Sequence, residues 1–188
     1  MSELVLLAAL LRSPAYGYAL KKTADLIFGG RAMHPNVVYP LLKKFVQKGW
    51  VEQSSMAADR GQTRKQYRIT AAGKKYLLDQ LSTFGEQDAA DDGAFLFRVA
   101  FFDAFSKERR QVILTARKLF LTSRSTELSE LQKATQPRSF GGIALNRVLG
   151  LVQDELRWIH KLESQIESNK GDVKCKPLLT HPATAHRS

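Results

Sequence analysis

The chain has 188 residues, a formal net charge of +11 and a pI near 9.9. This charge favours a polyanionic partner over a membrane, and no apolar run reaches the roughly eighteen residues that a membrane-spanning helix needs. The single cysteine, Cys175, excludes an internal disulfide and is typical of a protein in the reducing cytoplasm.

Two helices are predicted in the first thirty residues. Residues 3–12 are apolar almost all round, which is typical of a buried helix. After a turn at residues 13–14, apolar residues recur at helical spacing through residues 16–27 and predict a second helix. Tyr16 is therefore expected to pack in the core, whereas Tyr18 could either pack there or donate a hydrogen bond to a phosphate.

The stretch 34–70 has the element order of a winged helix. Apolar residues recur at helical spacing from about Asn36 until Gly49 stops the helix. Strands are predicted at residues 50–54 and 65–69, and the ten residues between them are polar, small or basic, as an exposed hairpin tip would be. A helix of this kind fits the major groove of DNA, and a basic hairpin beside it can contact the backbone.

The N-terminal sequence resembles the PadR-like family of transcriptional regulators. Three segments carry the resemblance and together span nearly all of residues 3–78: LVLLAALLRSPAYGYALKK, VVYPLLKKFVQKGWVE and GQTRKQYRITAAGKKYL. Gln66 stands where the family more often has a second aromatic residue. The resemblance implies a dimeric winged helix-turn-helix repressor whose C-terminal helices mediate dimerisation.

Eight polar and basic residues are the candidates for contact with double-stranded DNA. Residues 1–85 hold 13 Lys and Arg against 5 Asp and Glu, whereas residues 86–188 hold 16 against 13, so the basic excess lies with the winged helix. Asn and Lys can read base edges, and Tyr, Lys and Arg can hold phosphates. The candidates are Asn36, Tyr39, Lys43, Lys44, Arg60, Gln62, Arg64 and Lys65. The alternative is a solvated charged face on a winged-helix module that binds protein or acts as a scaffold.

The predicted fold is mainly α with a small β-hairpin wing, divided into two domains. A winged helix-turn-helix domain is expected at residues 1–84, and an α-helical dimerisation domain at residues 94–167. The acidic, glycine-flanked stretch 85–93 is interpreted as the joint between them. Residues 168–188 lack periodicity and are expected to form a flexible tail.

Two long helices are predicted in the C-terminal half, at about residues 107–136 and 143–167. Apolar residues recur in heptads along the second, and such a pattern forms a seam with another helix. A two-fold partner is the expected occupant, because paired half-sites on DNA require two recognition helices at fixed spacing. The predicted dimer seam consists of Leu145, Val148, Leu149, Val152, Leu156, Ile159, Leu162 and Ile166.

A phenylalanine-rich cluster offers a candidate effector pocket. Phe101, Phe105 and Trp158 are its candidate lining residues, since ligand sites are mostly apolar. The family resemblance implies a small aromatic effector such as a phenolic acid, and an ordinary core is the alternative interpretation. The histidines and Cys175 lack the spacing of a metal site, and no Ser or Cys is arranged with a base and an acid. No cofactor, metal site or enzymatic activity is therefore predicted.

Overall fold

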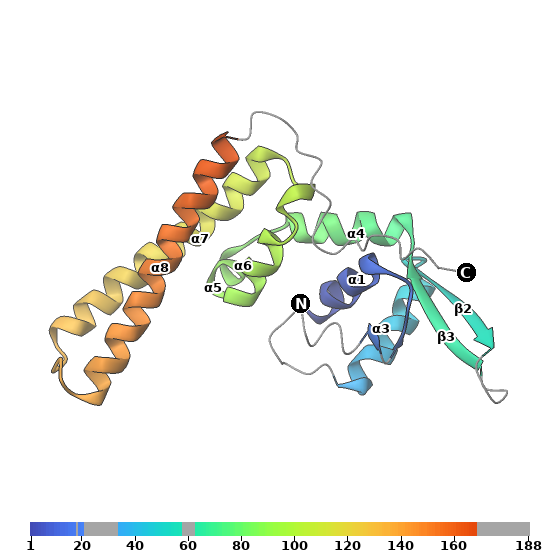
Figure 1. The fold of residues 1–188 in the computed structure, drawn as a ribbon, viewed down its shortest axis with the longest axis horizontal. Helices are drawn as coiled ribbons and strands as arrows, with labels where there is room; N and C mark the ends of the chain where they lie inside the picture. The colour runs from blue at the N-terminus through green and yellow to red at the C-terminus, as the bar shows by residue number, and fades with distance from the viewer. Residues whose placement is uncertain (18, 21–33, 58–62, 169–188) are drawn as a thin grey trace, which may run out of the picture. The chain divides into compact units, whose positions relative to one another are not determined.

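The structure is a computed structural model that describes residues 1–17, 19–20, 34–57 and 63–168. It is mainly helical, with one small antiparallel sheet (Figure 1), so the predicted fold class, mainly α with a β-hairpin wing, is confirmed. The chain forms two compact units that meet between Thr83 and Phe84. Within the residues described, none of the helices is long and apolar enough to cross a membrane.

In the part of the N-terminal unit that the structure describes, the helices α1, α3 and α4 accompany a three-stranded sheet. Its elements are α1 (Ser2–Arg12), β1 (Ala15–Tyr16), α3 (Pro35–Gln47), β2 (Val51–Ala57), β3 (Thr63–Ile69) and α4 (Ala71–Ser82). The strand order is β1–β3–β2, and both pairings are antiparallel. Residues 5–10 of α1 are almost completely buried, as their unbroken apolar sequence predicts. Leu77 and Leu81 of α4 complete this core from the other end of the unit.

Helix α3 is defined by clear start and stop signals. The His34 side chain caps its first turn by accepting a hydrogen bond from the Asn36 N–H at 3.4 Å, and Gly49 ends the segment with a left-handed φ of 70°. One face buries Val38, Leu42 and Phe45, which recur at helical spacing. The opposite face is exposed, so the polar and basic side chains of α3 lie on the surface of the unit.

The wing hairpin is fixed by close packing at its base. Thr70 caps α4 by accepting from the Gly73 N–H at 3.0 Å, and its hydroxyl donates to the Gly49 carbonyl at 2.7 Å. A Cβ at Gly73 would collide with the Trp50 carbonyl, so only glycine permits this close approach of helix and strand. The Trp50 ring stacks on Tyr76, with ring centroids 3.6 Å apart. The hairpin is therefore held at a fixed position beside α3.

Two expectations for the N-terminal unit are wrong. Ala15 and Tyr16 form the edge strand β1, because they pair with Tyr67 and Gln66 of β3 rather than starting a helix. Tyr16 is accordingly 37% exposed instead of packing in the core. The strands of the hairpin are also longer than expected, running to Ala57 and from Thr63. Tyr18 and most of the predicted second helix lie outside the described residues.

The C-terminal unit is a long helical hairpin with short helices against it (Figure 1). Its elements are α5 (Glu86–Ala90), α6 (Asp92–Val99), the 3-10 helix η2 (Phe102–Ala104), α7 (Lys107–Lys133) and α8 (Phe140–Ser168). Ser106 caps α7 by accepting from the Arg109 N–H at 3.3 Å. The stretch 85–93, expected to be a break, instead forms α5 and the start of α6, which Asp91 caps.

Two buried arginines hold the C-terminal unit together. Arg117 of α7 is fully buried and bonds both carboxylate oxygens of Glu155 on α8, at 2.8 and 2.9 Å. The same guanidinium bonds Asp92 of α6 and donates to the Ala89 carbonyl of α5 at 2.6 Å. Arg98, only 4% exposed, makes a 3.0 Å ion pair with Asp88. A buried charge needs such partners, so these contacts fix the packing of all four helices.

The heptad positions of α8 pack against another helix of the same chain. Leu149, Val152, Ile159 and Ile166 are buried, with Ile159 completely so, and α8 packs along the length of α7. The other seam residues, Leu145, Val148, Leu156 and Leu162, are partly buried. The helix that packs against the heptad positions of α8 is therefore α7. The expectation that these positions face a second chain does not fit the burial of the central residues.

Candidate nucleic-acid interface

Three of the candidate residues share one exposed stripe of α3. Asn36, Tyr39 and Lys43 are exposed and lie at positions i, i+3 and i+7 of the helix. The ring of Tyr39 rests against Gly17, where an added Cβ would come within 2.9 Å of the Tyr39 Cε1. Gly17 therefore leaves room for the Tyr39 ring, and a larger residue there would displace it.

Lys44 lies on a different side of α3. Its ammonium is 2.7 Å from a carboxylate oxygen of Glu3 on α1, and the hydrogen bond and charge of Glu3 raise the pKa of Lys44. A lysine that is already paired has less to offer an external anion than Lys43, the adjacent residue. The structure thus separates two lysines that the sequence grouped together.

Strand β3 supplies the basic side chains of the wing. Arg64 and Lys65 are both exposed, and although neighbours in a strand point to opposite faces of the sheet, both border the cavity described below. Lys65 shares its face with Tyr67, whose ring is buried. The other two wing candidates, Arg60 and Gln62, lie outside the described residues.

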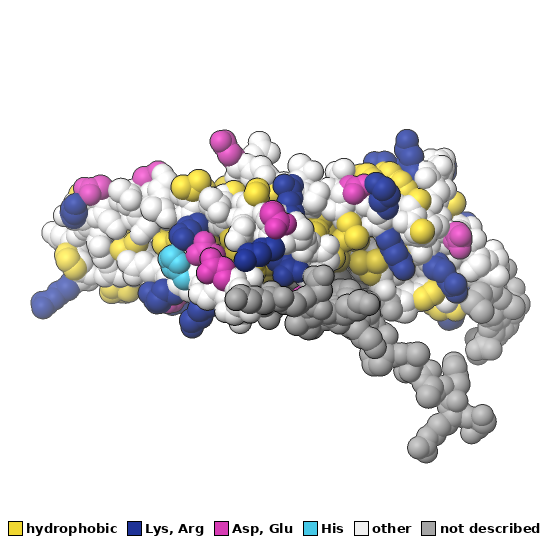
Figure 2. All heavy atoms as spheres, turned by 90° about the horizontal axis from the view of Figure 1, so that it is seen from above, with side chains coloured by type: hydrophobic (Ala, Val, Ile, Leu, Met, Phe, Trp, Pro, Cys, Tyr) yellow, Lys and Arg dark blue, Asp and Glu magenta, His cyan; other side chains and the backbone are white. Residues whose placement is uncertain are grey.

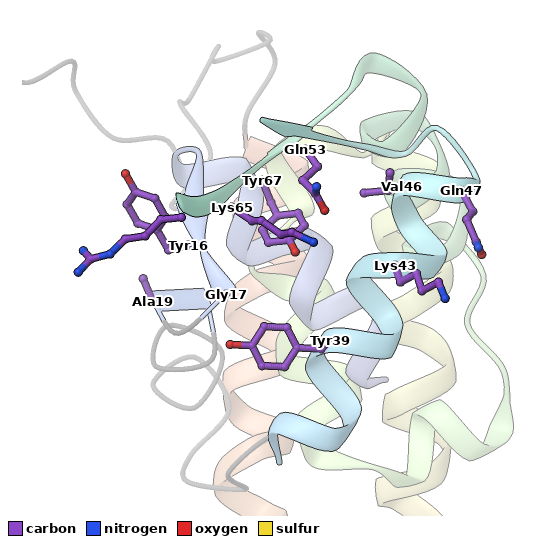
Figure 3. A pocket seen from close by; sticks show the side chains of 11 residues that line it. Tyr16, Gly17, Ala19, Tyr39, Lys43, Val46, Gln47, Gln53, Lys65 and Tyr67 are labelled. Atoms are coloured by element: carbon purple, nitrogen blue, oxygen red, sulfur yellow. The ribbon is translucent and has the colours of Figure 1, made fainter. Parts of the chain in front are cut away.

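A cavity of about 1030 Å³ lies between α3, β1 and the wing (Figure 3). It brings together four of the sequence-predicted residues, two from α3 and two from β3, whereas Asn36 and Lys44 are not among its lining residues. Figure 3 shows Tyr39 reaching from α3 toward Gly17 and Ala19, with Lys65 and Tyr67 beyond it. The lining residues are Tyr16, Gly17, Ala19, Tyr39, Lys43, Val46, Gln47, Gln53, Arg64, Lys65 and Tyr67.

The surface of this region is basic and its charges are available. In the part of the chain that the structure describes, Lys43, Arg64 and Lys65 form no ion pair. None of the described residues that line the cavity is acidic. An exposed helix stripe beside a basic hairpin, with unpaired cations on both, is an arrangement that suits a polyanion.

Residues 6–79 match the family described as "Transcriptional regulator PadR-like family". The chain belongs to this family. The match covers the winged helix, from α1 to the middle of α4 and beyond, and so includes every element that surrounds the cavity. No curated protein sequence matches the chain.

Solved structures similar to the chain come from several organisms. A putative transcriptional regulator from Thermoplasma acidophilum is 36% identical over 41% of this chain and 73% of its own, with a TM-score of 0.38. A PadR family regulator from Eggerthella lenta is 34% identical over 40% of this chain and 65% of its own, with a TM-score of 0.35. PadR of Bacillus subtilis in complex with operator DNA is 19% identical over 88% of this chain and 97% of its own, with a TM-score of 0.44.

Four residues of the PadR-like site were missed from the sequence. Gln47 lies four positions after Lys43, so the helical spacing of the candidate stripe could have identified it. Gln53 and Tyr67 face each other across β2 and β3, and only the strand register brings them together. Burial and the nearby Tyr39 raise the pKa of Tyr67, so its hydroxyl stays protonated and can donate a hydrogen bond. Tyr16 enters the site through β1.

The proposed effector residues of this PadR-like chain lie in the C-terminal unit. Phe101 and Phe105 are buried, and Phe101 packs edge-on against Phe97 with ring centroids 5.3 Å apart. Trp158 is partly buried and packs edge-on against Phe95 at 6.0 Å. These contacts are those of an ordinary aromatic core, which was the alternative interpretation of the cluster.

Proposed function

We propose that this PadR-like protein is a sequence-specific DNA-binding repressor that acts in the cytoplasm as a homodimer on a palindromic operator. The observation that carries the proposal is the exposed stripe of α3 beside cations of β3 that form no ion pair with the described residues. A helix of this size fits the major groove, and a neighbouring hairpin reaches the backbone. The lone cysteine supports a reducing compartment.

Five of the candidate residues divide among three roles in this proposal. Asn36, in the first turn of α3, would read a base edge, because an amide can bond an adenine at two atoms. Tyr39 and Lys43 would lie along the groove and reach phosphates. Arg64 and Lys65 would grip the backbone beside it, adding affinity for every sequence alike.

The binding experiment uses duplex DNA of random sequence at two salt concentrations. If the dimer neutralises roughly 6–10 phosphates, its affinity should fall about a thousandfold or more between about 50 and 200 mM salt. An affinity that does not depend on salt concentration, or no binding at all, would favour the alternative of a protein-binding or scaffold module. Selection of fragments from a random pool would then identify the operator.

The homodimer contact is proposed on the outer side of α7 and α8. Six of the eleven large apolar side chains that the described residues expose lie on these two helices. On α8, Phe140, Ile143 and Leu151 recur at helical spacing, and Phe140 is 91% exposed. The space-filling view in Figure 2 shows apolar side chains exposed among Lys and Arg in the part of the surface it presents. The six are Val112, Leu119, Leu131, Phe140, Ile143 and Leu151.

The dimer can be tested without damaging the core. Because Ile143 and Leu151 are exposed, changing both to Asp should leave the fold intact and give a monomer by light scattering. Leu96→Asp, at an equally exposed position of α6, is the matched control and should remain a dimer. A dimer that persists in the double variant would move the interface elsewhere. Val152→Asp with Ile159→Asp would instead bury charge and unfold the unit.

Release by a small aromatic effector is the remaining part of the proposal. To release DNA, the effector must bind the released state more tightly, and a coupling of about 1–3 kcal/mol would suffice. Titration of phenolic acids against the protein–DNA complex tests this part by itself. A panel that leaves DNA binding unchanged would leave the phenylalanine cluster with a structural role only.

A further inference from the structure

The cavity beside α3 has features that go beyond contact with a DNA backbone. Its volume of about 1030 Å³ is at the upper end of the range of ligand sites, which are commonly about 300–1,000 Å³. A concavity of this size can also accommodate a small molecule. The question is therefore what chemistry its lining offers to a small molecule.

Aromatic rings are the first component of the lining. Tyr16, Tyr39 and Tyr67 come from β1, α3 and β3, so three separate elements each contribute one ring. Tyr39 lies close to Gly17, and Tyr67 is buried apart from the part that lines the cavity. Rings held in this way can stack on a planar group, and stacking tolerates any base because every base has a π face.

Cations and amides are the second component. Lys43, Arg64 and Lys65 provide positive charge with no acidic residue among the described lining residues. Gln47 and Gln53 add side-chain amides, which can both donate to and accept from the edge of a base. The Tyr67 hydroxyl is a further donor, since its raised pKa keeps the proton on it. The set fits an anion joined to a planar, hydrogen-bonding ring.

We propose that this cavity binds a nucleotide, with the base against the tyrosines and the phosphate on the lysines and arginine. The inference rests on the proposed DNA-binding function, because Tyr39, Lys43, Arg64 and Lys65 serve both ligands. A bound nucleotide and duplex DNA therefore compete, and a free nucleotide acts as an inhibitor at the DNA surface itself. An unpaired nucleotide of a single strand has the same chemistry, so the experiment separates the two sources.

The first measurement uses the purified full chain without DNA, with adenosine monophosphate as the probe in equilibrium dialysis. Adenosine lacks the phosphate and ribose 5-phosphate lacks the base, so the two are matched controls. Each is expected to bind at least about tenfold more weakly than the nucleotide, since each removes either the charge contacts or the stacking. Equal binding of all three, or none, overturns the proposal.

Two variants then locate the site. Lys65→Ala removes an exposed lining cation and should weaken nucleotide binding about tenfold. Lys75→Ala removes an exposed cation of α4 in the same unit, away from the lining, and should leave binding unchanged. Val46→Trp narrows the cavity without changing charge and should also weaken binding. Equal losses from the two lysine variants would show a response to net charge only and would overturn the proposal.

Competition completes the test. With labelled duplex DNA held well below its dissociation constant, adenosine monophosphate should displace it over the concentration range in which it saturates the DNA-free protein, whereas adenosine should not. Nucleotide binding that leaves duplex affinity unchanged overturns the shared site. If a single strand of about ten nucleotides binds but the mononucleotide does not, the cavity is a site for unpaired nucleic acid. This result would overturn the proposal that it binds a free nucleotide. Duplex binding without nucleotide binding rejects this inference alone, and nucleotide binding without duplex binding rejects the proposed function alone.

Discussion

Three cations of the N-terminal unit and two of the C-terminal unit lie in opposite environments. In the N-terminal unit, Lys43, Arg64 and Lys65 are exposed and form no ion pair with any other residue that the structure describes. In the C-terminal unit, Arg98 and Arg117 are buried and bonded to carboxylates. The count of basic residues is similar in the two halves, but the C-terminal half holds 13 Asp and Glu against 5 in the N-terminal half. Burial and pairing thus neutralise part of the C-terminal positive charge, which supports the N-terminal unit as the proposed site of polyanion binding.

The acidic stretch 85–93 supplies partners for the two buried arginines. Asp88 pairs with Arg98, and Asp92 pairs with Arg117. Without these carboxylates, both guanidinium groups would be left in a low-dielectric interior with too few partners. The stretch is thus not a solvated linker, because its acidic residues neutralise the buried cations of the helices that follow it.

The largest effect is expected where a buried cation is removed. Arg117→Ala leaves Glu155 partly buried without its partner and opens space beside Phe95, over which the guanidinium lies at 5.3 Å. Removing one partner of a buried ion pair costs about 3–5 kcal/mol, so the free energy of unfolding in urea should fall by about this amount. The matched control is Lys75→Ala, which breaks an exposed pair with Asp79.

The control variant should unfold at the denaturant concentration of the unchanged protein, because exposed ion pairs contribute little. If Arg117→Ala unfolded with the same midpoint as that control, the buried network would be unimportant for stability. The cations of the two units would then differ in their exposure but not in their contribution to stability.

A smaller effect is expected for Asn36, on specificity rather than on stability. Asn36→Ala should reduce discrimination at one operator position by about 1–3 kcal/mol if the amide makes a bidentate contact with a base. Affinities for the selected operator and for random duplex DNA measure this difference. Equal losses on both DNAs would assign Asn36 to backbone contact.

Local sequence signals predicted the elements that carry the candidate site. The apolar period of α3 and its stop at Gly49 each depend on residues within a few positions, so the sequence alone indicates them. The same local signals place Tyr39 and Lys43 on one exposed face of α3.

Contacts between segments that are distant in the chain could not be predicted from the sequence. Strand β1 exists only because β3 pairs with it, and its two residues have no strand signal of their own. The heptads of α8 correctly indicated that another helix packs against it. A periodic pattern does not tell whether that helix belongs to the same chain. The cavity likewise depends on the register that sets Gln53 opposite Tyr67.

The smallest predicted effect is also the sharpest comparison, because it involves adjacent residues of one helix. Lys43 is unpaired within the described chain, whereas Lys44 is held by Glu3. A lysine that neutralises one phosphate adds about 0.9 to the slope of log affinity against log salt, so Lys43→Ala should lower that slope by roughly this amount per protomer. Lys44→Ala should lower it by less than half as much, since its charge is already compensated and releases few counterions from DNA. Duplex affinities of both variants over a salt series give the two slopes. Equal reductions would mean that the Glu3 contact breaks when DNA binds and that both lysines belong to the interface.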